Sequence, residues 1–148
     1  MAINQAVCAT FKEQVLLGEH DIVDDTINLA LFTSAATLNA NTTAYSVNDE
    51  VGDSGTYAAG GGTLASATVG LTKTNATAST AFVDFANLSF TSATISAQAA
   101  VIYNTSNASN TNAAIAVLDF GGVKTSTNGT FTIAFPTNDA SSAILRLS

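Results

Sequence analysis

Charged side chains and the residue types most used in catalysis are scarce in this chain. Only 10% of its 148 residues are charged, and it has one His, one Cys and no Trp. General acids and bases, nucleophiles and metal ligands are drawn mostly from such side chains. The composition therefore favours a protein that acts through its surfaces rather than an enzyme, and we expect no catalytic residue, no cofactor and no bound metal.

Basic residues are the scarcest charged type. Four Lys and Arg stand against eleven Asp and Glu, which gives a formal net charge of −7. A field of that sign repels phosphate, so nucleic acid is excluded as a partner. Residues 1–6 lack the basic start of a secretory signal, and no apolar run approaches the roughly 18 residues of a transmembrane helix. Cys8 alone cannot form an internal disulfide, so nothing in the sequence requires an oxidising compartment. We therefore expect a protein that is made in the cytoplasm, and the lack of a long apolar run predicts no membrane partner.

Residues 5–17 have the periodicity of an amphipathic helix. Asn4 is a favourable N-cap, and Gly18 is a favourable residue just after the last turn. An isolated helix of this length is marginal in water, so its apolar face must pack against another element. That face consists of Val7, Cys8, Phe11, Val15 and Leu16.

From residue 26 onward the pattern changes to that of β-strands. In the run 26–33, Ile27, Leu29 and Leu31 share one face. Clusters of Ser, Thr, Asn and Gly separate the later runs, as in all-β sandwiches and barrels. We predict a single domain, 1–148, that is an all-β antiparallel β-sandwich of jelly-roll or immunoglobulin type with one short N-terminal helix. The later strand-like runs are 64–73, 80–86, 88–96, 98–104, 113–120, 130–135 and 142–147.

The segment 113–136 has the pattern of a β-hairpin. Turn residues stand at both ends of its connection, as Gly121-Gly122 and Asn128-Gly129. The run 115–120 is apolar on both faces, which predicts a strand covered on both sides.

Two segments are predicted to be loops. Residues 34–63 lose all periodicity and end in Gly60-Gly61-Gly62. A loop of this length is usually functional or becomes ordered against a partner. The polar, low-complexity segment 104–112 is predicted to be an exposed loop.

The acidic residues offer the few candidates for chemistry. Asp49, Glu50 and Asp53 lie near a glycine, as in a Ca²⁺ loop, but they lack the acidic ladder of an EF-hand, and a solvated loop is the simpler interpretation. Asp84 and Asp119 could hydrolyse a glycoside if the fold brought them about 5–10 Å apart. The simpler interpretation is that each faces solvent or ends a strand, since the chain has no Trp to form a sugar platform.

His20 and Cys8 have simple structural interpretations. His20 precedes Asp21, as in part of a catalytic triad, but no nucleophile elbow accompanies the pair. We expect His20 to cap carbonyl groups at the end of the helix. Cys8 falls on the apolar face and is expected to fill the core.

Ten short segments, taken in order along the chain, form a recognisable set. They are VCATFK (7–12), GEHD (18–21), DTINLALFTS (25–34), TAY (43–45), EV (50–51), GTYAAGG (55–61), AFVDF (81–85), AVIYN (100–104), AVLDFG (116–121) and KTSTNG (124–129). The set spans nearly the whole chain and resembles a family of small virion proteins of tailed bacteriophages, widespread in cyanophages and marine phages. Two departures from the family pattern are Phe32, where Tyr is expected, and Val101, where Leu is common.

The resemblance implies a capsid cement (decoration) protein. Such proteins sit on the exterior of the virion head, on the lattice of the major capsid protein, often as homotrimers at threefold positions. The resemblance brings no catalytic, cofactor-binding or metal-binding residue with it. A second interpretation is a tail, baseplate or fibre-associated virion protein that contacts the host surface, and a third is a wall-degrading hydrolase that uses Asp84 and Asp119.

The N-terminal helix and the 40–63 loop are the expected contact elements, because neither promises enough burial within the chain itself. Multivalent binding by a symmetric oligomer would make many weak contacts strong. Deleting residues 1–17 is then expected to abolish trimerisation or head binding. The expected interface residues are Val7, Phe11, Val15, Leu16, Tyr45, Val51 and Tyr57.

Overall fold

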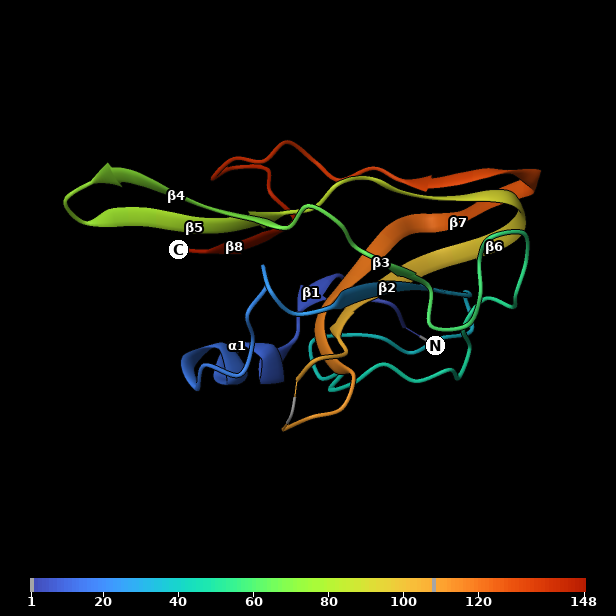
Figure 1. Ribbon diagram of the computed structural model, residues 1–148, viewed down its shortest axis with the longest axis horizontal. Coiled ribbons are helices and arrows are strands. Elements are labelled where there is room, and N and C mark those ends of the chain that lie inside the picture. Colours follow the sequence, from blue (N-terminus) through green and yellow to red (C-terminus); the bar gives the residue numbers. More distant parts are fainter. Residues whose placement is uncertain (1, 108) are drawn as a thin grey trace.

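The computed structural model describes residues 2–107 and 109–148 (Figure 1). Met1, at the start of the predicted domain, and Ala108, within the predicted loop 104–112, lie outside the described residues. The described part of the chain forms eight strands and one helix. These are β1 (Ala6–Val7), α1 (Ala9–Leu16), β2 (Ile27–Phe32), β3 (Gly62–Thr63), β4 (Thr68–Asn75), β5 (Ala78–Asp84), β6 (Leu88–Asn104), β7 (Ala113–Ile133) and β8 (Leu145–Leu147).

The strands form two antiparallel sheets. The five-stranded sheet has the order β1-β7-β6-β2-β3, and the three-stranded sheet has the order β4-β5-β8. The β4–β5 hairpin of the smaller sheet projects away from the rest of the molecule (Figure 1). Two antiparallel sheets with one short helix near the N-terminus confirm the predicted all-β, sandwich-like fold.

The two longest strands correct the sequence prediction. The runs 88–96 and 98–104 are one strand, β6, and the predicted hairpin 113–136 is wrong, because most of it is the single strand β7. β6 and β7 pair along nearly their whole lengths, from Leu88 opposite Ile133 to Asn104 opposite Ala113. The hairpin is therefore made by β6 and β7 together.

The glycines of β7 form a bulge instead of a turn. Between the pairs Ala99–Asp119 and Ala97–Lys124, β7 advances five residues while β6 advances two. Gly121 has φ +69° and Gly122 has φ +142°, conformations that side chains with a Cβ rarely adopt. Glycines in a strand often mark such bulges, and the long partner strand decides between a bulge and a turn.

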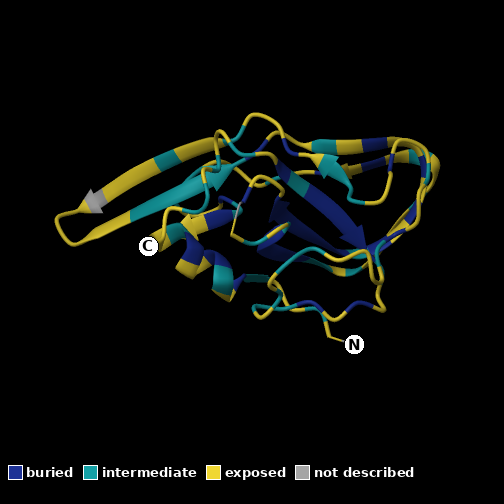
Figure 2. Cartoon of the chain, turned by 60° about the horizontal axis from the view of Figure 1, so that its bottom comes forward, coloured by how far each residue is buried: buried dark blue, intermediate teal, exposed yellow. Residues whose placement is uncertain are grey.

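The core is centred on β2, the C-terminal half of β6 and the N-terminal half of β7 (Figure 2). Residues 99–102 and 113–118 are buried, as the apolar run at 115–120 predicts for most of its length. β7 lies between β1 and β6 in the sheet, which makes it an interior strand. Each large apolar side chain buried here contributes roughly 1.5–3 kcal/mol to folding.

The helix is shorter than the predicted range 5–17. Ala6 and Val7 form β1 and pair with β7, and the Cys8 N–H donates to the Ile115 carbonyl at 2.9 Å. Pairing at the free edge of β7 satisfies backbone groups that a longer helix would leave without partners, so tertiary context overrides the helical pattern. Asn4 is therefore not the N-cap; Cys8 holds that position. Gly18 follows the C-cap with φ +74°, as predicted.

In the described part of the chain, no helix is long and apolar enough to cross a membrane.

Candidate functional site

The segment 34–63 lies along the outer edge of β2. β3 pairs only with Asn28 and Leu29, so the rest of this edge needs other partners. The Val51 N–H donates to the Leu31 carbonyl at 2.9 Å, and the Leu31 N–H donates to the hydroxyl of Tyr57 at 2.8 Å. Loop atoms therefore satisfy backbone groups that a further strand would otherwise satisfy.

The carboxylate of Glu50 connects separate parts of this loop by hydrogen bonds. Its carboxylate accepts hydrogen bonds from the Tyr45 hydroxyl at 2.6 Å, the Tyr57 hydroxyl at 2.7 Å and the Gly60 N–H at 2.8 Å. Tyr103 in β6 donates to the Gly60 carbonyl at 2.7 Å, and its ring stacks on Tyr45 with centroids 4.5 Å apart. Burial, followed by the hydrogen bond to Glu50, raises the pKa of Tyr45 and of Tyr57. The loop is thus ordered by its own chain.

The acidic group 49–53 serves this loop structure. Both Glu50 oxygens accept hydrogen bonds from protein donors, and Asp53 Oδ1 accepts the Ala59 N–H at 2.8 Å. Among the residues that the structure describes, no group of three or more His, Cys, Asp and Glu is arranged to hold a metal ion.

His20 belongs to a polar cluster next to α1, which it forms with Gln14, Asn104 and Asp25. Nε2 lies 2.9 Å from Gln14 Oε1, and Nδ1 lies 3.0 Å from Asn104 Nδ2, which also donates to Asp25 Oδ2 at 2.6 Å. An amide oxygen accepts and an amide nitrogen donates, so these two contacts assign the neutral tautomer with hydrogen on Nε2. Asn107 Nδ2, which lies 3.4 Å from Nε2, donates instead to the Glu19 carbonyl at 3.1 Å. Burial lowers the pKa of His20, while the nearby Asp25 and Glu19 carboxylates oppose that shift.

The predicted role of His20 as a carbonyl cap is therefore wrong, because the ring bonds to side chains. Its ring also packs against Phe11 in a T-shaped arrangement, with centroids 4.9 Å apart. Cys8 is fully buried, as expected, and burial raises the pKa of its thiol to about 11.

Asp84 and Asp119 lie on different sheets. Asp84 ends β5, opposite Thr68, whereas Asp119 lies in β7, opposite Ala99. Asp119 Oδ1 accepts the Gly121 N–H at 2.9 Å, and Asp84 Oδ1 is buried without a hydrogen-bond partner.

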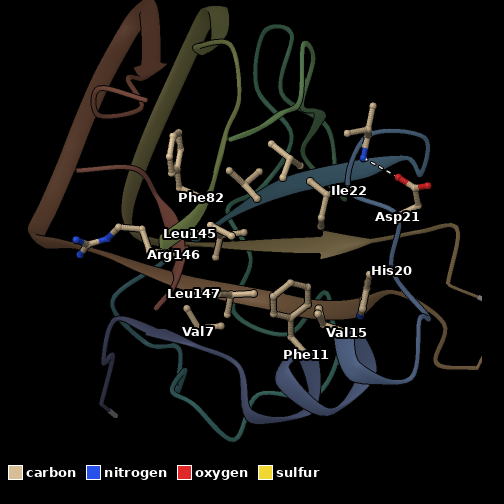
Figure 3. Close-up of a pocket in the computed structure, with 14 residues that line it drawn as sticks. Val7, Phe11, Val15, His20, Asp21, Ile22, Phe82, Leu145, Arg146 and Leu147 are labelled. Atoms are coloured by element: carbon tan, nitrogen blue, oxygen red, sulfur yellow. Dashed lines mark hydrogen bonds between the residues drawn. The ribbon is translucent and has the colours of Figure 1, made fainter. Parts of the chain in front are cut away.

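A largely apolar cavity of about 360 Å³ separates α1 from the three-stranded sheet (Figure 3). Phe11 and Val15 line it from the helix, and Leu145 and Leu147 line it from β8. Asp21 and Arg146 are charged residues among those that line it. A volume of this size is within the range of ligand and partner pockets.

The structure places the seven expected interface residues unevenly. Phe11, Val51 and Tyr57 are buried within the chain, and of these three Phe11 lines the cavity. Leu16 is exposed at the end of α1. The half-buried remainder is Val7, Val15 and Tyr45.

Sequence reasoning missed the apolar face of the small sheet. Alternation in β4 and β8 is the signal that could have revealed it, since a period of two places these residues on one side. It missed the role of Glu50 for another reason: the three donors to its carboxylate come from up to ten residues away, with no periodic spacing. The face consists of Val69, Leu71, Ala81, Val83, Leu145 and Leu147.

Comparison of the chain with protein-family models, with curated proteins and with solved structures finds no match.

Proposed function

We propose that this chain is a structural protein of a tailed-bacteriophage virion, a cement protein that binds the exterior of the head lattice of major capsid proteins as a homotrimer. The observation that carries the proposal is the resemblance of ten ordered segments to such virion proteins. Several of these segments form β2 and the buried halves of β6 and β7, and others supply Tyr45, Glu50 and Tyr57. The resemblance therefore rests on residues that build this scaffold.

The fixed loop supports the same proposal. A protein that occupies many equivalent lattice positions benefits from surfaces that are ordered before binding, because ordering on binding costs affinity at every site. The Glu50 network holds 45–60 against β2 and β6 without a partner.

Binding to separated particle parts tests the proposal. The purified full-length chain is mixed with heads and, separately, with tails of the phage that encodes it, and is then sedimented with them. We expect saturable binding to heads with hundreds of copies per particle, in a fixed ratio to the major capsid protein. Binding of a few copies to tails alone would support the tail or baseplate interpretation, and binding to neither would overturn both.

Deletion of residues 1–17 does not test head binding cleanly. It removes β1 and the buried side chains of Cys8 and Phe11, so the rest of the chain loses part of its core. Substitution of the exposed Leu16 by Ser keeps that core and is the better variant for this experiment.

A further inference from the structure

Exposed apolar side chains gather around the cavity between α1 and the three-stranded sheet. Among the residues that the structure describes, eight large apolar side chains are exposed, and six of them belong to α1, the turn after it, or this sheet. They are Leu16, Leu17, Val23, Val69, Leu71 and Leu147. Such a concentration marks an interaction site more often than scattered single residues do.

The outer part of the β4–β5 hairpin lacks support from its own chain. β8 pairs with β5 only at residues 81–83, so beyond Leu71 the hairpin is two-stranded. It projects into solvent, and its residues are mostly exposed or half-buried (Figures 1 and 2). A two-stranded hairpin alone is marginally stable in water, and an additional layer against its apolar face would stabilise it.

One side of this hairpin carries an apolar row that ends in a cation. Val69, Leu71 and Lys73 alternate along the regular part of β4 and therefore share a face. Most of the sheet residues that line the cavity belong to this face, which is therefore the one turned toward α1; they are Val69, Ala81, Val83, Leu145 and Leu147. Lys73 is one of only four basic residues in the chain.

The part of the cavity rim next to α1 has the opposite charge, whereas Arg146 lines the cavity from the sheet. The turn after α1 carries Asp21, Asp24 and Asp25, and Asp21 lines the cavity. Asp25 accepts hydrogen bonds within the chain, whereas Asp24 is exposed beside Val23. The Arg146 guanidinium donates to the Ser141 carbonyl, so the apolar floor and the acidic turn after α1 complement an apolar row that ends in a lysine.

We propose that the hairpin of one copy docks in the cavity of a second copy. Leu71 enters the apolar space between α1 and the sheet, and Lys73 pairs with the acidic turn at Asp24. The two contacting surfaces differ, so the contact is heterologous, and a rotation that closes it produces a ring such as a trimer. This inference deepens the self-association part of the proposed function, and it is tested without phage particles so that its failure is separate from a failure to bind heads.

Analytical ultracentrifugation of the full-length protein over a range of concentrations is the first test. We expect a closed oligomer, and we expect Leu71→Ser to weaken its association by roughly 10- to 100-fold, the loss for a large apolar side chain that is no longer buried. Val47→Ser is the matched control, since Val47 is 61% exposed, Leu71 is 57% exposed, and Val47 lies outside this face. A monomeric wild-type protein, or equal effects of the two variants, would overturn the proposal.

A charge exchange provides the second test and leaves the apolar contacts in place. Lys73→Glu and Asp24→Lys are each expected to weaken association several-fold, and the double variant is expected to regain most of the loss. If net charge alone mattered, Asp24→Lys would strengthen association, because it makes the acidic chain less negative. Strengthening by Asp24→Lys, or additive losses in the double variant, would show that the two residues do not meet across copies.

Small apolar molecules are the other candidate occupants of the cavity. The docking proposal is wrong, and the cavity is a ligand site, if three results are found together. The native protein is monomeric, an apolar fluorescent probe binds to it stoichiometrically, and Leu147→Asp abolishes that binding. If the probe competes with self-association and Leu71→Ser relieves the competition, the docking proposal is supported.

Discussion

Tyr57→Phe removes a single oxygen atom that joins the 34–63 loop to β2. The hydroxyl accepts the Leu31 N–H at 2.8 Å and donates to Glu50 Oε1 at 2.7 Å. Tyr57 is almost completely buried, and Phe keeps the shape and the apolar contacts of its ring, including the edge contact with Phe90. The hydroxyl also lies 3.4 Å from the Leu31 carbonyl, so the substitution isolates the effect of the hydrogen bonds that this hydroxyl makes.

The expected loss in the free energy of unfolding depends on which hydrogen bonds Leu31 and Glu50 keep after the substitution. The Leu31 N–H lies in the buried strand β2 and loses its acceptor, which costs about 1–3 kcal/mol. The hydrogen bond to the Glu50 carboxylate contributes about 1.5–3 kcal/mol, but Glu50 keeps its bonds from Tyr45 and Gly60. Since Glu50 keeps these two donors, we expect a total loss of about 2–4 kcal/mol.

Urea unfolding followed by far-ultraviolet circular dichroism measures this loss, at one protein concentration for all variants so that self-association contributes equally. Tyr45→Phe is the matched control, because it removes one hydrogen bond to the same carboxylate at a half-buried position and leaves Leu31 satisfied. We expect the control to lose less, about 1–2 kcal/mol, because its hydrogen bond is half-buried and no backbone donor loses its acceptor. A loss below about 1 kcal/mol for Tyr57→Phe, or equal losses in the two variants, would refute the argument that this hydroxyl joins the loop to the strand.

Four other properties can be measured in the same way. Gly61→Ala should destabilise the protein by about 2–4 kcal/mol, because Gly61 has φ +75° and a Cβ there would overlap the Leu29 carbonyl, whereas Gly52→Ala, with open space around it, should change stability by less than about 0.5 kcal/mol. Stability should fall as the pH drops below the ordinary histidine pKa of 6.5, because the pKa of His20 is lowered in the folded chain and the unfolded chain therefore binds the proton more tightly. Urea midpoints that stay constant between about pH 8 and pH 5 would contradict this. An equal fall in His20→Gln would contradict it as well. Stability should also fall as the pH rises above 10.0, because all three tyrosines have raised pKa values in the folded chain and ionise more readily when the chain is unfolded. Tyrosinate absorbance that appears before the circular dichroism signal of the folded chain is lost would be inconsistent with this. Cys8, with its thiol pKa raised to about 11, should react with thiol reagents only as fast as the protein opens, so labelling in native buffer at the rate seen in urea would show that the thiol is accessible.

Local pattern was enough to predict some strands and not others. The run 26–33 is β2 almost residue for residue, because the apolar residues that alternate along it are buried in the core. The same reasoning failed at 113–136, where glycines that would suit a turn form a bulge in β7. Which of the two occurs depends on β6, a partner whose length the local pattern does not contain.

The helix and the long loop show the same dependence on distant partners. Residues 5–17 satisfy helical periodicity, yet Ala6 and Val7 pair with β7 because its edge offers backbone partners. The loop 34–63 has no periodicity, yet it is fixed by Glu50 and by the edge of β2. Neither result could be predicted from a window of neighbouring residues, because both depend on contacts between segments far apart in the chain.

Lys73 could have either of two roles, and only a change in the sign of its charge distinguishes them. A lysine on an edge strand such as β4 can simply prevent uncontrolled pairing with other strands. Glutamate would serve that purpose about as well, so Lys73→Glu would leave a specific oligomer unchanged if protection were its only role. Pairing with the acidic turn at Asp24 instead requires a positive charge, so the substitution would weaken the oligomer until Asp24→Lys is added. The response of Lys73 to a change of sign therefore separates a protected edge from a contact surface on the same hairpin.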